Sequence, residues 1–323
     1  MKIKSMLKIN IRGYIVLILI SIIISSCVKD LKKFDVDNED PKIVLNALVN
    51  PDSLMKIHVT QTIGALEEEK MKILNNAIVE VYQNDNLIET LDEYENGFYF
   101  DPGFYAMEGE KYRVVVQVPG FETVFSDIEI QHRPVISKID TSSIYFYDGF
   151  YYNNEFQVVV NFEDDRSGKN YYMIELRDEN YFSTSFRTHD PKAELAIDYG
   201  VYQVYMDDEY GTWGSKMVFS DKLISSDNAN FKFQLMLGYY YPDYETDSIE
   251  TFYITLSEIS EDFYYYLRSM SIYSEDEFEN FFVEKVTLFS NVNNGIGMVA
   301  TLASSTYILE KVKKKDPSIN YDY

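Results

Sequence analysis

The sequence has a single cysteine, only three histidines, and far fewer basic than acidic residues. Cys27 has no second cysteine with which to form an intrachain disulfide. The histidines, His58, His132 and His189, have no other His or Cys at metal-ligand spacing, so we expect neither a metal site nor a cofactor. Lys and Arg total 29 against 53 Asp and Glu, and the formal charge of −24 disfavours binding to nucleic acid.

Aromatic residues are abundant by contrast, with 29 tyrosines and 21 phenylalanines among 323 residues. A strongly acidic chain that lacked aromatic residues would be a candidate for disorder, so this aromatic content argues for a packed fold. A chain of roughly 300 residues commonly forms two domains. No internal repeat is visible, and the sequence therefore predicts no repeat array.

The N-terminal 26 residues carry four basic side chains and no acidic one, and they include an apolar run from Tyr14 to Ile24. A basic start, a short apolar core and small residues at its end are typical of a secretory signal peptide. A membrane-spanning anchor is the alternative, but a span needs about 20 apolar residues and this run is shorter. Residues 1–26 are therefore predicted to be a signal peptide.

Cys27 follows directly, in the stretch "IISSCVKDL". This stretch resembles the lipobox of bacterial lipoproteins, in which the cysteine sulfur is acylated and the chain is cut just before it. Two or three acyl chains, at about 0.8 kcal/mol per buried methylene, make a durable anchor. Lys29 and Asp30 resemble the Cys-x-Lys-acidic signal that sends Bacteroidota lipoproteins to the outer face of the outer membrane. We therefore expect residues 27–40 to be an acylated tether and the protein to be lipid-anchored at the cell surface.

Residues 41–133 contain short runs with the alternation of half-buried strands. In "KYRVVVQV", Tyr112, Val114, Val116 and Val118 fall on one face. Seven such runs with turn residues between them predict an immunoglobulin-like or carboxypeptidase-regulatory-like β-sandwich. The runs are "KIVLNALV", "KIHVTQTI", "AIVEVYQ", "LIETLDE", "GFYF", "YRVVVQV" and "ETVFSDIEI".

Residues 134–323 are predicted to form a larger, antiparallel β domain, because alternating runs follow one another without helix-length segments between most of them. One helix is expected at about 258–273. Ser257 or Ser260 can cap it, and Glu261 and Asp262 suit its first turn. The one-sided apolar sets in the strands are Phe156, Val158, Val160 and Phe162; Tyr172, Ile174 and Leu176; and Phe231, Phe233, Leu235 and Leu237.

Six blocks in order resemble the Bacteroidota lipoproteins grouped as domain of unknown function 4249, from about residue 41 to 303. The resemblance implies an N-terminal sandwich like those found beside TonB-dependent transporters. It implies no catalytic residue, because none is established for the family. The blocks are "PKIVLNALVNPDS", "LNNAIVEVYQNDNLIETL", "VPGFETV", "FSDKLI", the "YYYL" helix and "VTLFSNVNNGIGMVAT".

Two short patterns that suggest enzymatic or metal chemistry fail on context. Ser53 and Lys56 are spaced as in the S-x-x-K serine enzymes, but Lys56 enters a predicted strand, whereas that nucleophile opens a helix. The stretch "DVDNED" at 35–40 begins like a calcium loop, but Asp40 stands where such a loop needs glycine. We expect no enzyme, and we interpret the acidic clusters as solvated faces.

Tyrosine-rich stretches are the best candidates for ligand contact. "YFYDGFYYNN" at 145–154 and "GYYYPDY" at 238–244 offer flat apolar rings with hydroxyl groups, suited to a sugar or to a protein partner. The alternative is that these rings pack back onto the sandwich. The candidate contact residues are Tyr147, Tyr151, Tyr240 and Tyr244.

Three classes of function fit these observations. The first is a non-enzymatic accessory or interaction protein, anchored in the outer membrane through Cys27 and associated with a TonB-dependent transporter. The second is a surface module that binds glycan or peptide through the tyrosine-rich loops. The third, a hydrolase, has no nucleophile and base pair that the sequence can show. We expect the first class.

The lipobox interpretation makes a direct prediction. Cys27→Ala removes the only thiol that can be acylated, so labelled palmitate should no longer enter the protein and the uncut precursor should accumulate. Metabolic labelling followed by immunoprecipitation measures both. Palmitate incorporation into the Cys27→Ala variant would show that the anchor lies elsewhere.

Overall fold

The computed structural model describes residues 40–64, 67, 71–147, 152–164, 168–177, 186–187, 216–221, 228–235, 248–279 and 287–313. The predicted signal peptide and almost all of the predicted tether lie outside these residues. The described residues from 41 to 63 and from 67 onward belong to one compact unit.

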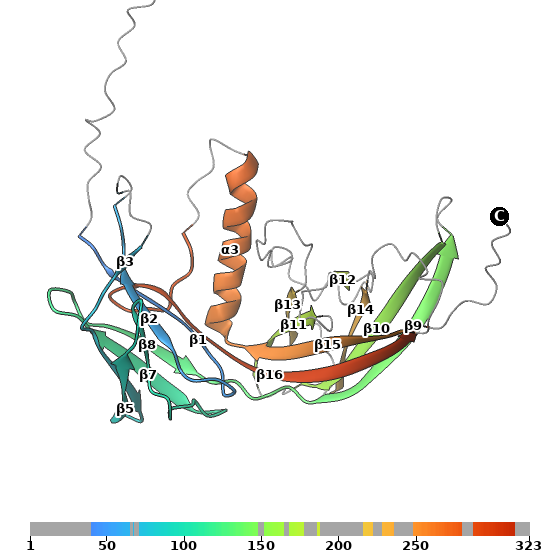
Figure 1. Ribbon diagram of the computed structural model, residues 1–323, viewed down its shortest axis with the longest axis horizontal. Coiled ribbons are helices and arrows are strands. Elements are labelled where there is room, and N and C mark those ends of the chain that lie inside the picture. Colours follow the sequence, from blue (N-terminus) through green and yellow to red (C-terminus); the bar gives the residue numbers. More distant parts are fainter. Residues whose placement is uncertain are drawn as a thin grey trace, which may run out of the picture. The chain divides into compact units, whose positions relative to one another are not determined.

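Eight strands form the first part of the unit, and they enclose one apolar core (Figure 1). The sheet runs in the order β1-β2-β6-β5-β4-β7-β8, with β3 paired to β2. Its inner face buries side chains from all of these strands except β3. The strands are β1 (Ile43–Val49), β2 (Ile57–Gln61), β3 (Lys72–Ile73), β4 (Ile78–Gln83), β5 (Asn86–Glu93), β6 (Phe98–Phe100), β7 (Lys111–Gln117) and β8 (Val124–Glu129).

The predicted alternation in this part is confirmed. Tyr112, Val114, Val116 and Val118 are all buried in the core, whereas the side chains between them face outward. The turn between β4 and β5 places two consecutive residues in the left-handed region, Asn84 at φ 48° and Asp85 at φ 62°. Asparagine and aspartate tolerate this conformation, which matches the twist of a two-residue hairpin.

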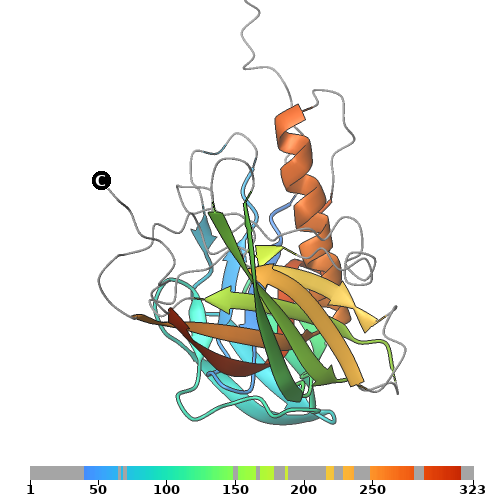
Figure 2. The same ribbon diagram turned by 90° about the vertical axis from the view of Figure 1, so that its right-hand side faces the viewer.

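Within the described residues, eight further strands and one helix form the second part. Strands β13-β11-β15-β16 continue the large sheet, and β12-β14-β10-β9 form a separate four-stranded sheet. Figure 2 shows the strands of the two layers crossing. The elements are β9 (Ile136–Tyr147), β10 (Tyr152–Glu163), β11 (Tyr171–Arg177), β12 (Phe186–Arg187), β13 (Lys216–Ser220), β14 (Asn228–Leu235), β15 (Ser248–Ile259), α3 (Glu261–Glu279) and β16 (Ile296–Lys313).

A second core fills the space between these two layers. Val158, Val160 and Phe162 of β10 pack with residues of β11, β13 and β15. The predicted set Tyr172, Ile174 and Leu176 belongs to this core. The intervening residues of β11 are buried as well, because the opposite face of that strand packs in a third cluster with α3.

Helix α3 lies against this opposite face of the sheet. Tyr264 and Leu267 of the helix pack with Tyr171, Met173 and Leu302 of the strands. The helix begins at Glu261, three residues later than predicted, because the chain up to Ile259 still pairs in β15. The hydroxyl of Ser260 accepts a hydrogen bond from the amide of Phe263 at 3.3 Å, so Ser260 is the N-cap.

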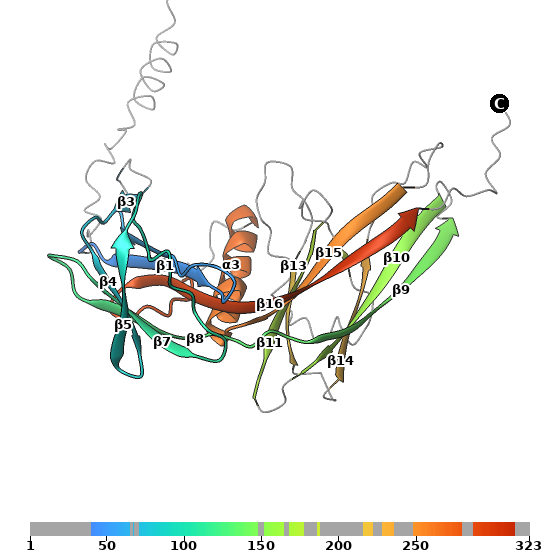
Figure 3. The same cartoon turned by 60° about the horizontal axis from the view of Figure 1, so that its bottom comes forward.

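The long strand β16 joins the two parts (Figure 3). Its first six residues pair in parallel with β1, from Val44 opposite Ile296 to Val49 opposite Thr301. Its remaining twelve residues pair antiparallel with β15, up to Lys313. The strands β1 and β16 approach closely at Gly297, which has φ +123° and no room for a side chain.

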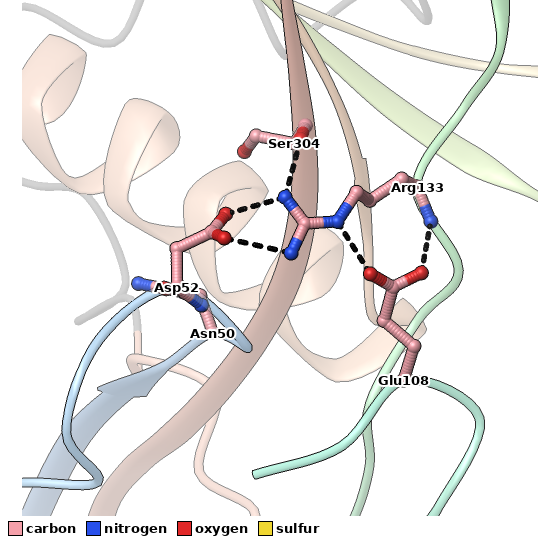
Figure 4. Close-up of polar contacts among 5 residues, drawn as sticks. All are labelled: Asn50, Asp52, Glu108, Arg133 and Ser304. Carbon is pink, nitrogen blue, oxygen red and sulfur yellow. Dashed lines mark hydrogen bonds and ion pairs between the residues drawn. The ribbon is translucent and has the colours of Figure 1, made fainter. Parts of the chain in front are cut away.

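Arg133 lies between the two parts, in the segment that links β8 to β9 (Figure 4). Its guanidinium donates two hydrogen bonds to the carboxylate of Asp52, at 2.8 and 2.7 Å. It also contacts Glu108 through both its Nε and its backbone amide, and its Nη1 lies 3.5 Å from the carbonyl oxygen of Ser304. The hydrogen bond to Asp52 is the largest cause of the raised pKa of the Arg133 guanidinium, and the hydrogen bond to Glu108 is the second. Arg133 therefore holds three separate segments at the side of β16.

The mostly β fold with one helix near the C-terminal end is confirmed. The domain boundaries at 133/134 stay predictions. Two residues beyond that boundary, Val292 and Val299, are nevertheless part of the first core.

Gly297 provides a test of the β1–β16 approach. A Cβ at this position would lie 2.1 Å from the carbonyl oxygen of Leu45, whereas a Cβ at Gly120, with φ +88°, would meet nothing within 4 Å. We expect Gly120→Ala to lower the free energy of unfolding by ~1–3 kcal/mol through backbone strain alone. Gly297→Ala should cost clearly more, because the clash adds to the strain. Urea unfolding of both variants measures the difference, and equal losses would contradict the steric explanation.

Candidate functional site

Most of the residues predicted to carry function lie outside the described part of the chain. These are the lipidation residue Cys27, the export residues Lys29 and Asp30, and three of the four tyrosines, Tyr151, Tyr240 and Tyr244. The backbone of Tyr147 ends β9 and pairs with Tyr152 of β10. The predicted roles of all seven residues stay predictions.

An open groove with a volume of about 550 Å³ lies within the described residues. Strands β7 and β8 and the β4–β5 turn provide one wall, and the start of α3 provides the other. Residues of β16 and the segment before it complete the lining. The polar lining side chains are Tyr82, Asn84, Asp85, Lys111, Arg113, Asp127, Glu129, Gln131, Ser260, Glu261, Asp262, Asn291 and Thr301.

Both basic side chains of the sheet wall are engaged in ion pairs between β7 and β8. Arg113 donates two hydrogen bonds to the carboxylate of Asp127, at 2.7 and 3.0 Å. Lys111 lies 3.1 Å from Glu129 on the next rung of the ladder. These pairs are exposed to solvent, which screens them, so they contribute little stability. Their main effect is to neutralise the two cations that line the groove.

The helix wall presents two carboxylates in the first turn of α3. Glu261 accepts a hydrogen bond from the hydroxyl of Tyr171 at 2.6 Å, and Lys169 lies 3.6 Å away. The Tyr171 hydrogen bond lowers the pKa of Glu261, and Lys169 lowers it further. The partial positive charge at a helix N-terminus also favours carboxylates in this position. Glu261 is therefore ionised at neutral pH.

The base of the groove is held by three segments distant in sequence. The amide of Asn291 donates to Asp262 at 3.2 Å and to the carbonyl of Val299 at 3.0 Å. The hydroxyl of Thr301 donates to the carbonyl of Glu129 at 2.8 Å. These contacts fix the start of α3 relative to the edge of β8, so the groove is a built feature of the fold.

The lining has a net excess of hydrogen-bond acceptors and of negative charge. Five carboxylates line it against two cations, and both cations are already paired within the wall. The side-chain oxygen of Gln131 is buried and has no hydrogen-bond partner in the described structure. A ligand that supplies hydroxyl, ammonium or guanidinium donors would complement this surface.

Other polar clusters in the described residues have structural explanations. The hydroxyl of buried Tyr172 donates to Asp164 at 2.7 Å. Burial is the larger cause of the raised pKa of Tyr172, and this hydrogen bond is the second. His58 is half-buried, and its ring stacks on Phe98 at a centroid distance of 4.3 Å. No group of three or more His, Cys, Asp or Glu in the described residues could hold a metal ion. The described part of the chain also contains no helix long and apolar enough to cross a membrane.

The S-x-x-K pattern is not set in a helix. Ser53 lies in an exposed turn, and its amide bonds to the carbonyl of Asn50 at 3.5 Å. Lys56 directly precedes β2, and its ammonium lies over the ring of Phe100, 5.3 Å from the centroid. The pattern therefore lacks the structural context of the serine enzymes it resembles.

The fold and the groove together define the class of this molecule: a β-rich protein with two sheet-enclosed cores and an open acidic groove beside its helix. Residues 31–308 match the family described as Domain of unknown function (DUF4249), and the chain belongs to this family. A search of curated proteins found no match.

Among the groove residues, the sequence pattern singled out Glu261 and Asp262, which suit the first turn of a helix. Their proximity to Asp127 and Glu129 depends on pairings between distant segments, and no local pattern carries that information.

The lowered pKa of Glu261 predicts a pH effect on stability. A carboxylate whose folded pKa lies below its unfolded value stabilises the fold above the unfolded value, and that stabilisation is lost as the pH falls through the folded pKa. Between pH 7 and pH 3.5, wild type should therefore lose more free energy of unfolding than Glu261→Gln does. Denaturant titrations at both pH values test this, with Glu122→Gln, an exposed acid outside the groove, as control. A loss in Glu261→Gln as large as in wild type would contradict the prediction.

Proposed function

We propose that this protein is a lipid-anchored outer-membrane lipoprotein that acts without catalysis, as an accessory or interaction protein of a TonB-dependent transport system. The acidic groove is proposed as the surface that contacts its partner. The anchor is proposed at Cys27, with Lys29 and Asp30 as the signal for surface display.

Support for the anchor comes from the N-terminal sequence. Four basic residues, a short apolar run and two serines precede the single cysteine of the chain. An exported protein with one unpaired thiol gains from acylation, because the modification removes a reactive group and adds a durable anchor. The transport association rests on the resemblance of the N-terminal part to sandwiches found beside TonB-dependent transporters.

The observation that carries the binding role is the balance of charge in the groove. Five carboxylates line it, and ion pairs within the wall already engage both of its cations. Surface electrostatics of this kind steer a cationic patch toward the site and raise the rate of association. The hydrogen bonds of Asn291 and Thr301 preorganise the walls, which lowers the entropy cost of binding.

A glycan- or peptide-binding module is the second candidate function. The groove supports this second function because Tyr82 offers a half-buried ring in the same lining as Asn84 and several carboxylates. Sugar hydroxyls donate to such acceptors while the sugar ring packs on an aromatic face. Tyr240 and Tyr244 of the predicted loops are the other contact residues proposed for this candidate function.

Removing groove charge should weaken partner binding without unfolding the protein. Asp85→Asn keeps a residue that tolerates positive φ, and Asp262→Asn keeps the size of the helix residue. We expect the double variant to bind its partner at least about tenfold more weakly, as expected when two charge-assisted contacts are lost. Photo-crosslinking from position 85 in whole cells, with mass spectrometry of the adduct, identifies the partner.

A matched pair of substitutions outside the groove, Asp92→Asn with Glu122→Gln, changes the net charge equally and should leave binding unchanged. An adduct with a TonB-dependent barrel supports the accessory role, and protection of the crosslink by soluble glycan supports the second candidate. Equal weakening by the two double variants would remove the groove from the binding site.

A further inference from the structure

The outer face of β2, β6 and β5 carries four aromatic rings. Tyr99 of β6 is fully buried in the first core, so its neighbours Phe98 and Phe100 point outward. Tyr94 directly follows β5, and its amide donates to the carbonyl of Phe98 at 2.8 Å. On the other side of β6, His58 of β2 lies opposite Phe98. We refer to His58, Tyr94, Phe98 and Phe100 as the aromatic strip.

Contacts within the aromatic strip hold its rings in place. The ring of Phe98 stacks on that of His58, with a centroid distance of 4.3 Å and an interplanar angle of 15°. The Nε2 of His58 in turn lies 3.1 Å from the carbonyl oxygen of Asn96. The ring of Tyr94 packs on Phe100 at a centroid distance of 5.1 Å. Because each outer ring is already supported by a second one, a ligand would lose little entropy in ordering them.

The two outer rings of the strip are open to solvent. Tyr94 is 65% exposed and Phe98 is 40% exposed. Single exposed apolar side chains are common, but rings that contact one another across neighbouring strands form a contiguous patch. A stable protein interface takes roughly 20–30 residues from each partner, which is far more than this patch offers. Its size suits a ligand of a few sugar rings instead.

Polar side chains border the strip and complement sugar hydroxyls. The ammonium of Lys56 lies over the ring of Phe100, 5.3 Å from its centroid, and exposed Asp92 lies opposite Phe100 on β5. Exposed Asn46 of β1 lies opposite His58. Ammonium and amide groups donate hydrogen bonds and a carboxylate accepts them, whereas a hydroxyl does both. The net charge of −24 disfavours an anionic sugar, so the surface suits a neutral one.

We infer that the aromatic strip is a binding site for a neutral oligosaccharide. Tyr94 and Phe98 pack against the apolar faces of its sugar rings, and Lys56 and Asp92 form hydrogen bonds with its hydroxyls. The rings of the strip are not among the residues that line the acidic groove. The inference therefore depends neither on the groove nor on the lipid anchor.

Calorimetric titration of the full chain in detergent with cellohexaose, xylohexaose, mannohexaose and maltohexaose tests the proposal. At least one of these neutral sugars should bind. In saturation-transfer NMR, irradiation of the aromatic protons of the protein should transfer signal to the bound sugar. Failure of all four sugars to bind would overturn the proposal, as would binding without transfer from aromatic protons.

Substitutions in the strip locate the bound sugar. Tyr94→Ala should lower the affinity about tenfold or more and leave the fold intact, because this side chain is mostly exposed. Phe98→Leu keeps apolar bulk beside His58 but removes the ring, and it should weaken binding similarly. Tyr105→Ala removes a tyrosine outside the strip that is 49% exposed, and it should bind normally. Unchanged affinity in both strip variants would place the sugar elsewhere and overturn the proposal.

A photo-crosslinker at position 94 in whole cells tests for the competing occupant, which is a protein. We expect the sugar that binds in calorimetry to suppress any protein adduct formed from this position. A protein adduct that survives an excess of this sugar would assign the strip to a protein partner and overturn the oligosaccharide proposal.

Discussion

The pairing of β1 with the first six residues of β16 is the constraint on which the rest of the structure depends. It brings together residues 252 positions apart, such as Asn46, whose side chain accepts a hydrogen bond from the amide of Met298. It also delivers Val299 to the first core and leaves the rest of the same strand to pair with β15. One continuous strand therefore belongs to both cores, and no flexible linker separates them at this point.

The groove and the part of β16 that extends past β1 both follow from this pairing. At the end of the pairing, Thr301 bonds to Glu129 and fixes the edge of β8 beside the start of α3, which creates the groove. Beyond Thr301 the strand extends past the end of β1, and Arg133 contacts it at Ser304, where the two strands separate. The two surfaces differ in chemistry. The groove offers carboxylate side chains, whereas β16 beyond Ser304 has uncharged residues at 305–309 and charged residues from Glu310 onward.

Local patterns predicted the parts of the fold that local physics determines. The alternation in β7 identified its buried face, and the serine before an acidic pair identified the start of α3 to within a few residues. The burial of both faces of β11 was not predictable, because it depends on α3, which lies far along the sequence. The parallel pairing of β1 with β16 was equally hidden, since each strand alone has the pattern of any half-buried strand. The groove could not be predicted for the same reason, because its two walls are joined only by contacts between residues far apart in the sequence.

The position of β16 near the C-terminal end has a consequence for the order of folding. Residues 296–301 complete the first core, yet they are among the last described residues to be synthesised. Folds dominated by contacts between distant residues form slowly, and their incomplete states expose apolar surface and unpaired strand edges. The first core can therefore be completed only after residues 296–301 have been synthesised, and until then the edge of β1 that they cover stays unpaired.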